Sequence, residues 1–533
     1  MRTIPRIHPT LIAVALAWLS PASASAQLTN ADLRCAPDDA ELDLHRYLRA
    51  LSLDLRGVVP TVVEHEAVED AGELPEDLID QWLDSEEFVT RSVRIHRDLL
   101  WNSLTNIQLV GNRHRIGVFR VAGGQPIWWR AAQSNYYRGG PQRAQCLDQP
   151  ARFDAGGALL VEVDEEGYRR EGWVMVSPYW DPTTEIRVCG FDAQAALVSP
   201  SGTDCSTTAA LADYECGCGP ELRWCAPGAV NAAITRSMTE ALERRMGDLF
   251  RDDRPYTDLF TGRRTYVNGH LVHFWKHLRN FPRGLQFDPP PMDLALLPDL
   301  TYSQEGVWAE IELDSAHAGV LTDPAFLLRF QTNRARANRY YTMFLCQPFS
   351  APPGGLPSPA DSCSSEPDLQ QRCGCKYCHS LLEPTASHWG RWSQQGAAYL
   401  DPERFPRTRA DCEACALRGQ QCNTECRRFY VTRAIDPRQE PYLGGLNAYE
   451  FRRPEHERNV EAGPRLLALS TITDNRLPLC SAGNVVRMLF GRETGQHEGE
   501  WLQSLATGFV QGGYSWRGLI KAVVTSPVYR RVR

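Results

Sequence analysis

The stretch Cys375-Lys376-Tyr377-Cys378-His379 carries the most specific signal in this sequence of 533 residues. C-x-x-C-H is the attachment sequence of a c-type haem, in which two thiols three residues apart each form a thioether with the porphyrin. The histidine that follows is held beneath the iron and can supply an axial nitrogen. The motif therefore predicts a cytochrome c-like segment with one covalent haem, anchored by Cys375 and Cys378, with His379 as the proximal iron ligand.

The N-terminus has the pattern of a secretory signal peptide over residues 1–26. Arg2 and Arg6 precede a short apolar stretch, and Ala24-Ser25-Ala26 is a small-residue cleavage site. That stretch is too short to span a bilayer, and no later segment reaches about 18 uninterrupted apolar residues. C-type haem is attached outside the bacterial cytoplasm, so the predicted export of the chain is consistent with the haem attachment motif. We expect an exported bacterial protein, periplasmic, cell-surface or secreted, without a membrane span.

The composition of the chain argues against some classes of binding partner. The formal net charge is -8 and becomes more negative when the signal is removed, which argues against binding to nucleic acid or to an anionic membrane. The 17 cysteines suit an oxidising compartment. Two would anchor the haem, leaving an odd number, so at least one other thiol is unpaired within the monomer. The sequence indicates neither a particular redox partner nor an oligomeric state.

The expected fold is mainly α and multidomain, with a β-rich, cysteine-containing middle insert and a cytochrome c-like haem segment. Helical periodicity, breaker residues and changes of composition divide the chain. The expected units are a signal peptide at 1–26, a helical domain at 27–114, a β-rich, disulfide-containing insert at 115–228, a helical domain at 229–345, a haem-binding and cysteine-rich segment at 346–450, and a helical domain at 451–533.

Local patterns predict individual elements within these units. Apolar spacing predicts helices near 44–51, 75–84 and 86–103, and again at 482–490, 501–509 and 516–524. Residues 172–176 and 185–189 have the β-rich composition of two strands separated by turn residues. Cys205, Cys216, Cys218 and Cys225 are expected to form disulfides.

Several stretches together resemble exported haem-c proteins of planctomycetes and myxobacteria that are built from planctomycete cytochrome-associated domains of unknown function. The matching pieces are residues 49–57 with Pro60-Thr61, residues 256–268, residues 318–322 with Pro324 and Phe326, Leu345-Cys346, the region of Pro353, Glu383-Pro384 after the motif, and residues 519–529. The resemblance implies a secreted or periplasmic protein with one haem c, and it implies no known reaction. The β-rich middle and the loop at 412–426 match less well.

The sixth iron position would decide what the haem does. A methionine or a second histidine closes the site for electron transfer, whereas an open position permits ligand binding or peroxide chemistry. The candidates are His317, His273 and Met488. His270, His273 and His277 have the i, i+3, i+7 spacing of one helix face, which could also hold a metal. His388 lies closer to the motif but beyond Pro384, and core packing is an alternative for Met488.

The remaining cysteines leave alternatives to haem attachment. Cys375 and Cys378 could combine with Cys412 and Cys415 in a zinc ribbon, and Cys373 could compete for a disulfide with the motif. Cys412, Cys415, Cys422 and Cys426 form a compact set, for which two disulfides are favoured over a structural zinc.

The functional hypotheses differ in the role of the haem. The first is a single-haem cytochrome-like protein for electron transfer. The alternatives are a haem-dependent peroxidase or oxidase-type enzyme, and a cell-surface binding module with structural haem or a zinc site. Whether the chain is an enzyme stays open, because the sequence contains no H-E-x-x-H, G-x-S-x-G or phosphate-binding loop motif.

Overall fold

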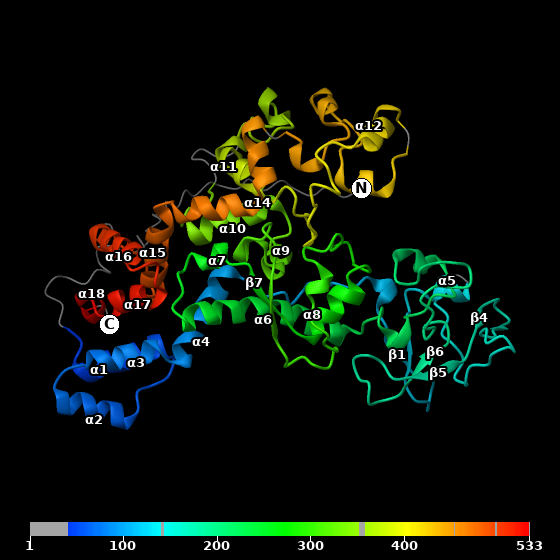
Figure 1. The fold of residues 1–533 in the computed structure, drawn as a ribbon, viewed down its shortest axis with the longest axis horizontal. Helices are drawn as coiled ribbons and strands as arrows, with labels where there is room; N and C mark the ends of the chain where they lie inside the picture. The colour runs from blue at the N-terminus through cyan, green and yellow to red at the C-terminus, as the bar shows by residue number, and fades with distance from the viewer. Residues whose placement is uncertain are drawn as a thin grey trace, which may run out of the picture.

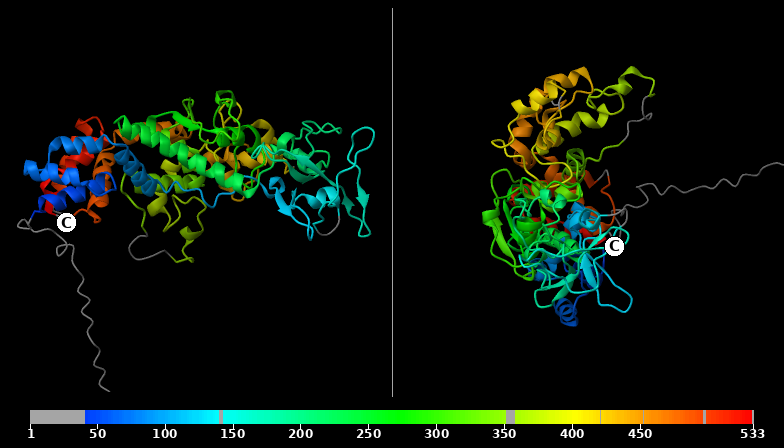
Figure 2. Two further views of the ribbon diagram at one scale, coloured as in Figure 1. Left: turned by 90° about the horizontal axis from the view of Figure 1, so that it is seen from below. Right: turned by 90° about the vertical axis from the view of Figure 1, so that its right-hand side faces the viewer.

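The computed structural model describes residues 41–139, 143–350, 358–419, 421–451, 453–495 and 498–531. The expected signal peptide and Cys35 lie outside the described residues. Helices dominate, and the strands are few and short, which confirms a mainly α fold with several disulfides. The molecule is elongated, with the β-rich insert at one end and the N- and C-terminal helices at the other (Figures 1 and 2).

The N-terminal unit is a set of four helices. They are α1 (Leu44–Leu55), α2 (Val62–Ala71), α3 (Glu76–Leu83) and α4 (Glu86–Leu100). The side chain of Ser85 accepts a hydrogen bond from the Phe88 amide and starts α4. Phe88, His96 and Leu100 lie on the buried face of this helix. The helix predicted over 86–103 ends early, because Trp101 adopts a left-handed conformation with φ of 51°.

The insert contains a four-stranded sheet in the order β1-β2-β6-β5. Its elements are β1 (Gly117–Phe119), β2 (Ile127–Trp129), α5 (Ser134–Arg138), β3 (Glu162–Val163), β4 (Arg169–Arg170), β5 (Trp173–Val176) and β6 (Ile186–Cys189). The predicted strands near 172–176 and 185–189 are confirmed as β5 and β6, which pair antiparallel with Trp173 opposite Cys189. β2 and β6 pair in parallel.

The helical body that follows is built around the long helix α6. Its elements are α6 (Gly228–Arg251), α7 (Asp258–Thr261), β7 (Arg264–Val267), α8 (Gly269–His273), a π-helical turn (Phe274–Leu278), β8 (Ala309–Glu312), α9 (Pro324–Arg329) and α10 (Asn333–Phe344). β7 and β8 form an antiparallel pair that the helical prediction for 229–345 did not include.

The last third of the chain is helical. It contains α11 (Lys376–Ala386), α12 (Ala410–Leu417), α13 (Thr424–Phe429), α14 (Pro454–Ile472), α15 (Arg476–Phe490), α16 (Gly499–Gln511), α17 (Trp516–Val524) and α18 (Pro527–Arg531). The three predicted C-terminal helices correspond to α15, α16 and α17. In the described part of the chain, no helix is both long and apolar enough to cross a membrane.

One hydrophobic core joins the two ends of the chain. It extends from Tyr47 in α1 to Tyr529 in α18 and includes residues of the helical body. The Tyr47 hydroxyl donates to the Val524 carbonyl at 2.8 Å, and the Tyr529 hydroxyl donates to the Asp54 carboxylate at 2.6 Å. Residues 44–55 and 516–531 therefore do not fold independently where they meet: α1 and α3 lie beside α17 and α18 (Figure 1). The borders between the expected domains stay a prediction.

Seven disulfides pair fourteen of the cysteines that the structure describes. The pairs are Cys146–Cys189, Cys205–Cys216, Cys218–Cys225, Cys346–Cys480, Cys363–Cys373, Cys412–Cys426 and Cys415–Cys422. The prediction that Cys205, Cys216, Cys218 and Cys225 form disulfides is confirmed. Disulfides persist in oxidising compartments, so this pattern supports a location outside the cytoplasm.

Candidate functional site

The two unpaired thiols of the described chain are Cys375 and Cys378. Cys375 caps the N-terminus of α11, and Cys378 and His379 lie in the first turn of that helix. The helix begins at this point because Gly374, with φ of 80°, turns the chain sharply after the Cys363–Cys373 disulfide. The structure thus brings the three predicted residues of the C-x-x-C-H motif together on one short piece of helix.

His379 is oriented by a neighbouring carboxylate. Its Nδ1 lies 2.8 Å from Glu383 Oε1, one helical turn further along α11. Glu383 is buried and also accepts from Arg334 Nε of α10 at 2.5 Å, whereas the His379 ring is partly exposed. A carboxylate accepts but does not donate, so Nδ1 carries the proton and Nε2 keeps its lone pair. This arrangement suits a metal-binding imidazole, whose second nitrogen usually donates to a carboxylate or carbonyl.

The far half of α11 is buried in the core, whereas the motif half is partly exposed. Leu382, Thr385 and Ala386 are buried, and the Thr385 hydroxyl donates to the Tyr341 hydroxyl oxygen at 3.2 Å. In contrast, the Tyr377 side chain beside the motif is 59% exposed. The donor set of two thiols and one oriented imidazole on a rigid helix fits the attachment of a c-type haem.

The alternatives that use other cysteines are not supported. Cys412 pairs with Cys426 and Cys415 with Cys422, so these four residues form the two favoured disulfides and offer no thiolate to zinc. The same pairs exclude the zinc ribbon with Cys375 and Cys378. The competition expected from Cys373 is likewise absent, because Cys373 pairs with Cys363.

His317 does not face a space in which a porphyrin could lie. It is buried, its Nε2–H donates to the Pro291 carbonyl at 2.5 Å, and its ring packs edge-on against Trp392. It lines a cavity of about 30 Å³, together with Arg245 and Asp323. A space of this size holds only a few atoms, so haem cannot enter it.

His273 and Met488 belong to other parts of the fold. His273 in α8 is stacked on Tyr179, with ring centroids 3.7 Å apart, and its Nε2–H donates to the Arg223 carbonyl at 3.1 Å. Met488 in α15 is half-buried and packs against the main core, as its apolar neighbours suggested. In Figure 1, α11 and the segment that follows it lie above the helical body built around α6, and α8 belongs to that body; Figure 2 shows the same separation. The structure does not bring these two residues or His317 together with His379.

The other histidines considered from the sequence also have partners of their own. The His388 Nδ1–H donates to the Gly463 carbonyl at 3.0 Å. His270 contacts Ser237 and Glu305. The α-helix α8 ends at His273 and residues 274–278 form a π-helical turn, yet the rings of His273 and His277 lie 5.0 Å apart, so these two histidines are close together as their spacing suggested.

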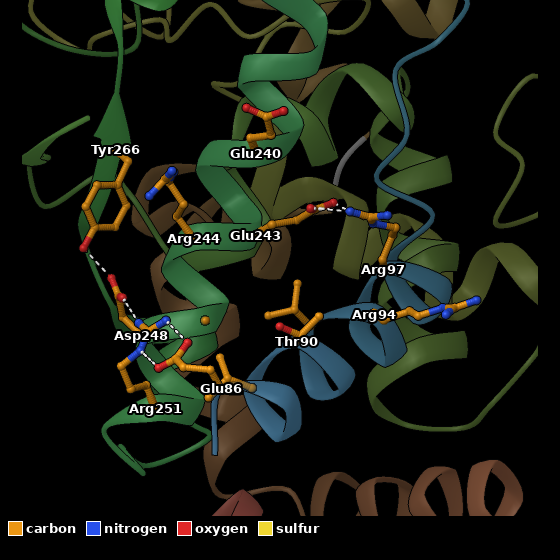
Figure 3. A pocket seen from close by; sticks show the side chains of 13 residues that line it. Glu86, Thr90, Arg94, Arg97, Glu240, Glu243, Arg244, Asp248, Arg251 and Tyr266 are labelled. Atoms are coloured by element: carbon orange, nitrogen blue, oxygen red, sulfur yellow. Dashed lines mark hydrogen bonds and ion pairs between the residues drawn. The ribbon is translucent and has the colours of Figure 1, made fainter. Parts of the chain in front are cut away.

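A groove of about 460 Å³ between α4 and α6 was not expected from the sequence (Figure 3). Ion pairs cross it at two points: Arg97 binds Glu243 at one, and Arg251 binds both Glu86 and Asp248 at the other. Arg94, Glu240 and Arg244 also line it. Its charges balance and it contains no histidine, cysteine or serine, so it offers no group that titrates near neutral pH. No motif marks this groove, because its charged residues have ordinary helical spacing.

Comparison with protein-family models, with curated proteins and with solved structures finds no significant match to this chain. The case for a function therefore depends on the motif and its surroundings.

Proposed function

We propose that this chain is an exported, single-haem c-type cytochrome-like protein that transfers electrons. In this proposal Cys375 and Cys378 are the thioether anchors, and His379 is the proximal iron ligand. The main observation in support of this proposal is which cysteines form disulfides and which do not. Fourteen of the sixteen described cysteines form disulfides, and the two that do not are the pair that the C-x-x-C-H motif assigns to haem.

The attachment chemistry needs no further reactant besides haem. Each thiol adds across one vinyl group, so that a sulfur–carbon bond forms and the thiol hydrogen passes to the neighbouring carbon. The thiols must be reduced and unpaired for this addition. The disulfides of Cys363 with Cys373 and of the 412–426 loop support the proposal, because they remove the nearest competing cysteines in the sequence.

The surroundings of His379 support its role as a ligand. When bound, the haem would supply one-electron chemistry. Glu383 holds the proton on Nδ1 and leaves Nε2 free to bind iron, and Arg334 holds the Glu383 carboxylate in place from α10. A ligand fixed in this way changes little in position when the charge of the iron changes, which suits electron transfer.

The test is to express the protein with and without a c-type haem maturation system. We expect a pyridine haemochrome spectrum of the c type and the mass of one haem retained after denaturation. Cys378→Ser should lose the covalent haem or retain it through one thioether only. The double variant Cys415→Ser/Cys422→Ser removes two cysteines of the same region and should keep normal attachment.

The spectrum also separates the proposal from its alternatives. A low-spin spectrum, with slow or no carbon monoxide binding when reduced, is expected for electron transfer. A high-spin spectrum with rapid ligand binding would instead favour a peroxidase or oxidase-type enzyme. A colourless protein from cells with an active maturation system would refute haem attachment.

A further inference from the structure

A second cleft lies where the β-rich insert meets the helical body. Its volume is about 430 Å³, within the range of small-molecule sites. Tyr179 and Arg223 line it from the insert, and Lys276, His277, Thr301 and Tyr302 line it from the body. We call it the insert cleft. It is separate from the C-x-x-C-H motif, whose residues are not among those that line it.

The insert contributes Arg223 to this cleft on a strained loop. The Cys218–Cys225 disulfide closes the loop, and within it Glu221 and Leu222 have φ of 55° and 62° although neither is glycine. Residues other than glycine adopt this region at a cost, and such residues concentrate at functional sites. Two hydrogen bonds fix the loop: the Tyr179 amide donates to the Glu221 carbonyl at 2.9 Å, and His273 donates to the Arg223 carbonyl at 3.1 Å.

The cleft contains two half-buried cations without a counter-charge. Arg223 and Lys276 form no ion pair, although the structure describes both side chains and their surroundings. Each donates only to a backbone carbonyl, Arg223 to Pro220 and Lys276 to Pro298. The two carboxylates that line the cleft, those of Glu221 and Asp299, belong to exposed residues that are well hydrated.

The positive charge of Arg223 and Lys276 also affects His277, which lines the cleft. Burial and the nearby charges of Arg223 and Lys276 lower the pKa of His277 to about 4, so this imidazole is neutral at pH 7. Metal cations are disfavoured beside two fixed positive charges. Ser177 and Ser303 also line the cleft, and their hydroxyl groups can donate hydrogen bonds to an anion, whereas the Thr301 hydroxyl donates to Gln304 Oε1 at 3.1 Å.

We propose that the insert cleft binds a small organic oxyanion, a carboxylate or a phosphate monoester, with its charged group between Arg223 and Lys276. Charge-assisted hydrogen bonds from the two cations supply the main attraction. The rings of Tyr179 and Tyr302 form an aromatic wall beside them, so an anion with an attached ring should bind more tightly than the bare ion.

The test is calorimetric titration of the exported full chain at pH 7 and constant ionic strength. The probes are inorganic phosphate, phenyl phosphate and benzoate, so that phosphate and carboxylate recognition are distinguished. We expect saturable binding of phenyl phosphate or benzoate at one site per chain. Arg223→Gln and Lys276→Gln should each weaken it about tenfold or more, the usual effect of losing one charge-assisted hydrogen bond.

The matched control is Arg94→Gln, which removes an unpaired arginine from the groove between α4 and α6 and should leave binding unchanged. Lys276→Gln serves as the second variant in case Arg223→Gln disturbs the strained loop, and near-ultraviolet circular dichroism checks that both are folded. The absence of saturable binding of all three probes to the parent protein would overturn the proposal. An equal loss of binding in Arg94→Gln would also overturn it, because it would indicate attraction to overall charge.

Discussion

Acid should weaken the packing of α4 against α6 and α17 through His96. This side chain is 1% exposed, with Nδ1 2.8 Å from the Ser92 carbonyl and Nε2 3.1 Å from the Tyr256 hydroxyl. Burial lowers its pKa from 6.5 to about 4. Between these two values the unfolded chain binds a proton that the folded chain does not, so stability falls as the pH falls.

The size of the effect follows from the two pKa values. A full difference of this kind corresponds to about 3 kcal/mol once the pH is below both values. At pH 5 the contribution already amounts to about 2 kcal/mol relative to pH 7.5. Buried His388, whose pKa is also lowered to about 4, acts in the same direction. Buried Asp323 acts in the opposite direction, because burial raises its pKa to about 6.

The assay is hydrogen-exchange mass spectrometry of peptides from α4 and α17, corrected for intrinsic exchange rates, from pH 7.5 to pH 5. It reports the free energy of local opening, which suits a chain of several units better than a global transition does. His96→Gln should reduce the slope of this free energy with pH by about 1.3 kcal/mol per pH unit near pH 5. This is the slope expected when opening is coupled to the uptake of one proton.

Tyr256→Phe is the matched control. It removes the hydrogen bond to His96 Nε2 and should destabilise the region by about 1 kcal/mol at every pH, while leaving the titrating imidazole in place. Its slope should therefore equal that of the parent protein. An unchanged slope in His96→Gln would refute the reasoning, because the proton uptake would then belong to another group.

Four further variants test other parts of the structure. With haem attached as proposed, Glu383→Gln should raise its reduction potential in a spectroelectrochemical titration, because a carboxylate on His379 would stabilise the oxidised iron, and Arg334→Gln should lower it. Glu171→Gln leaves buried Arg138 with only the longer ion pair to Asp192, at 3.6 Å, and should cost about 3 kcal/mol, measured as lost exchange protection of β5 and β6. Cys346→Ala/Cys480→Ala removes the link between the end of α10 and α15, and should lower the free energy of opening of α15 by about 2–5 kcal/mol in the same measurement.

Local patterns made several elements predictable from the sequence. The apolar faces of α4, α15, α16 and α17 repeat at helical spacing, and the strands β5 and β6 are marked by β-rich runs on either side of a turn. The motif residues are adjacent in the chain, so their proximity needed no knowledge of the fold. The disulfides of Cys205 to Cys225 were predictable for the same reason, since their partners lie within 11 residues.

Features that depend on distant residues could not be predicted. Cys346 and Cys480 are 134 residues apart, and their pairing depends on how α10 and α15 pack. β7 pairs with β8 across some forty residues that contain α8. The π-helical turn over residues 274–278 was not predicted either, because the spacing of His270, His273 and His277 was taken as that of a regular helix, although the rings of His273 and His277 still lie 5.0 Å apart. The insert cleft combines Arg223 and Lys276 from two units, and neither has a sequence motif.

The packing of α11 against α10 connects the fold to the proposed haem site. Its buried half contacts α10 through Thr385 and Tyr341, and Arg334 reaches from the same helix to Glu383. The orientation of His379 is therefore determined by two helices of the folded protein. The two thiols, three residues apart, lie on the other half of α11, where both are partly exposed and Cys378 also packs against the main core. Since the helical body fixes His379 and the partly exposed first turn carries the two thiols, the body around α10 would contribute to the electronic environment of a bound haem iron as well as to stability.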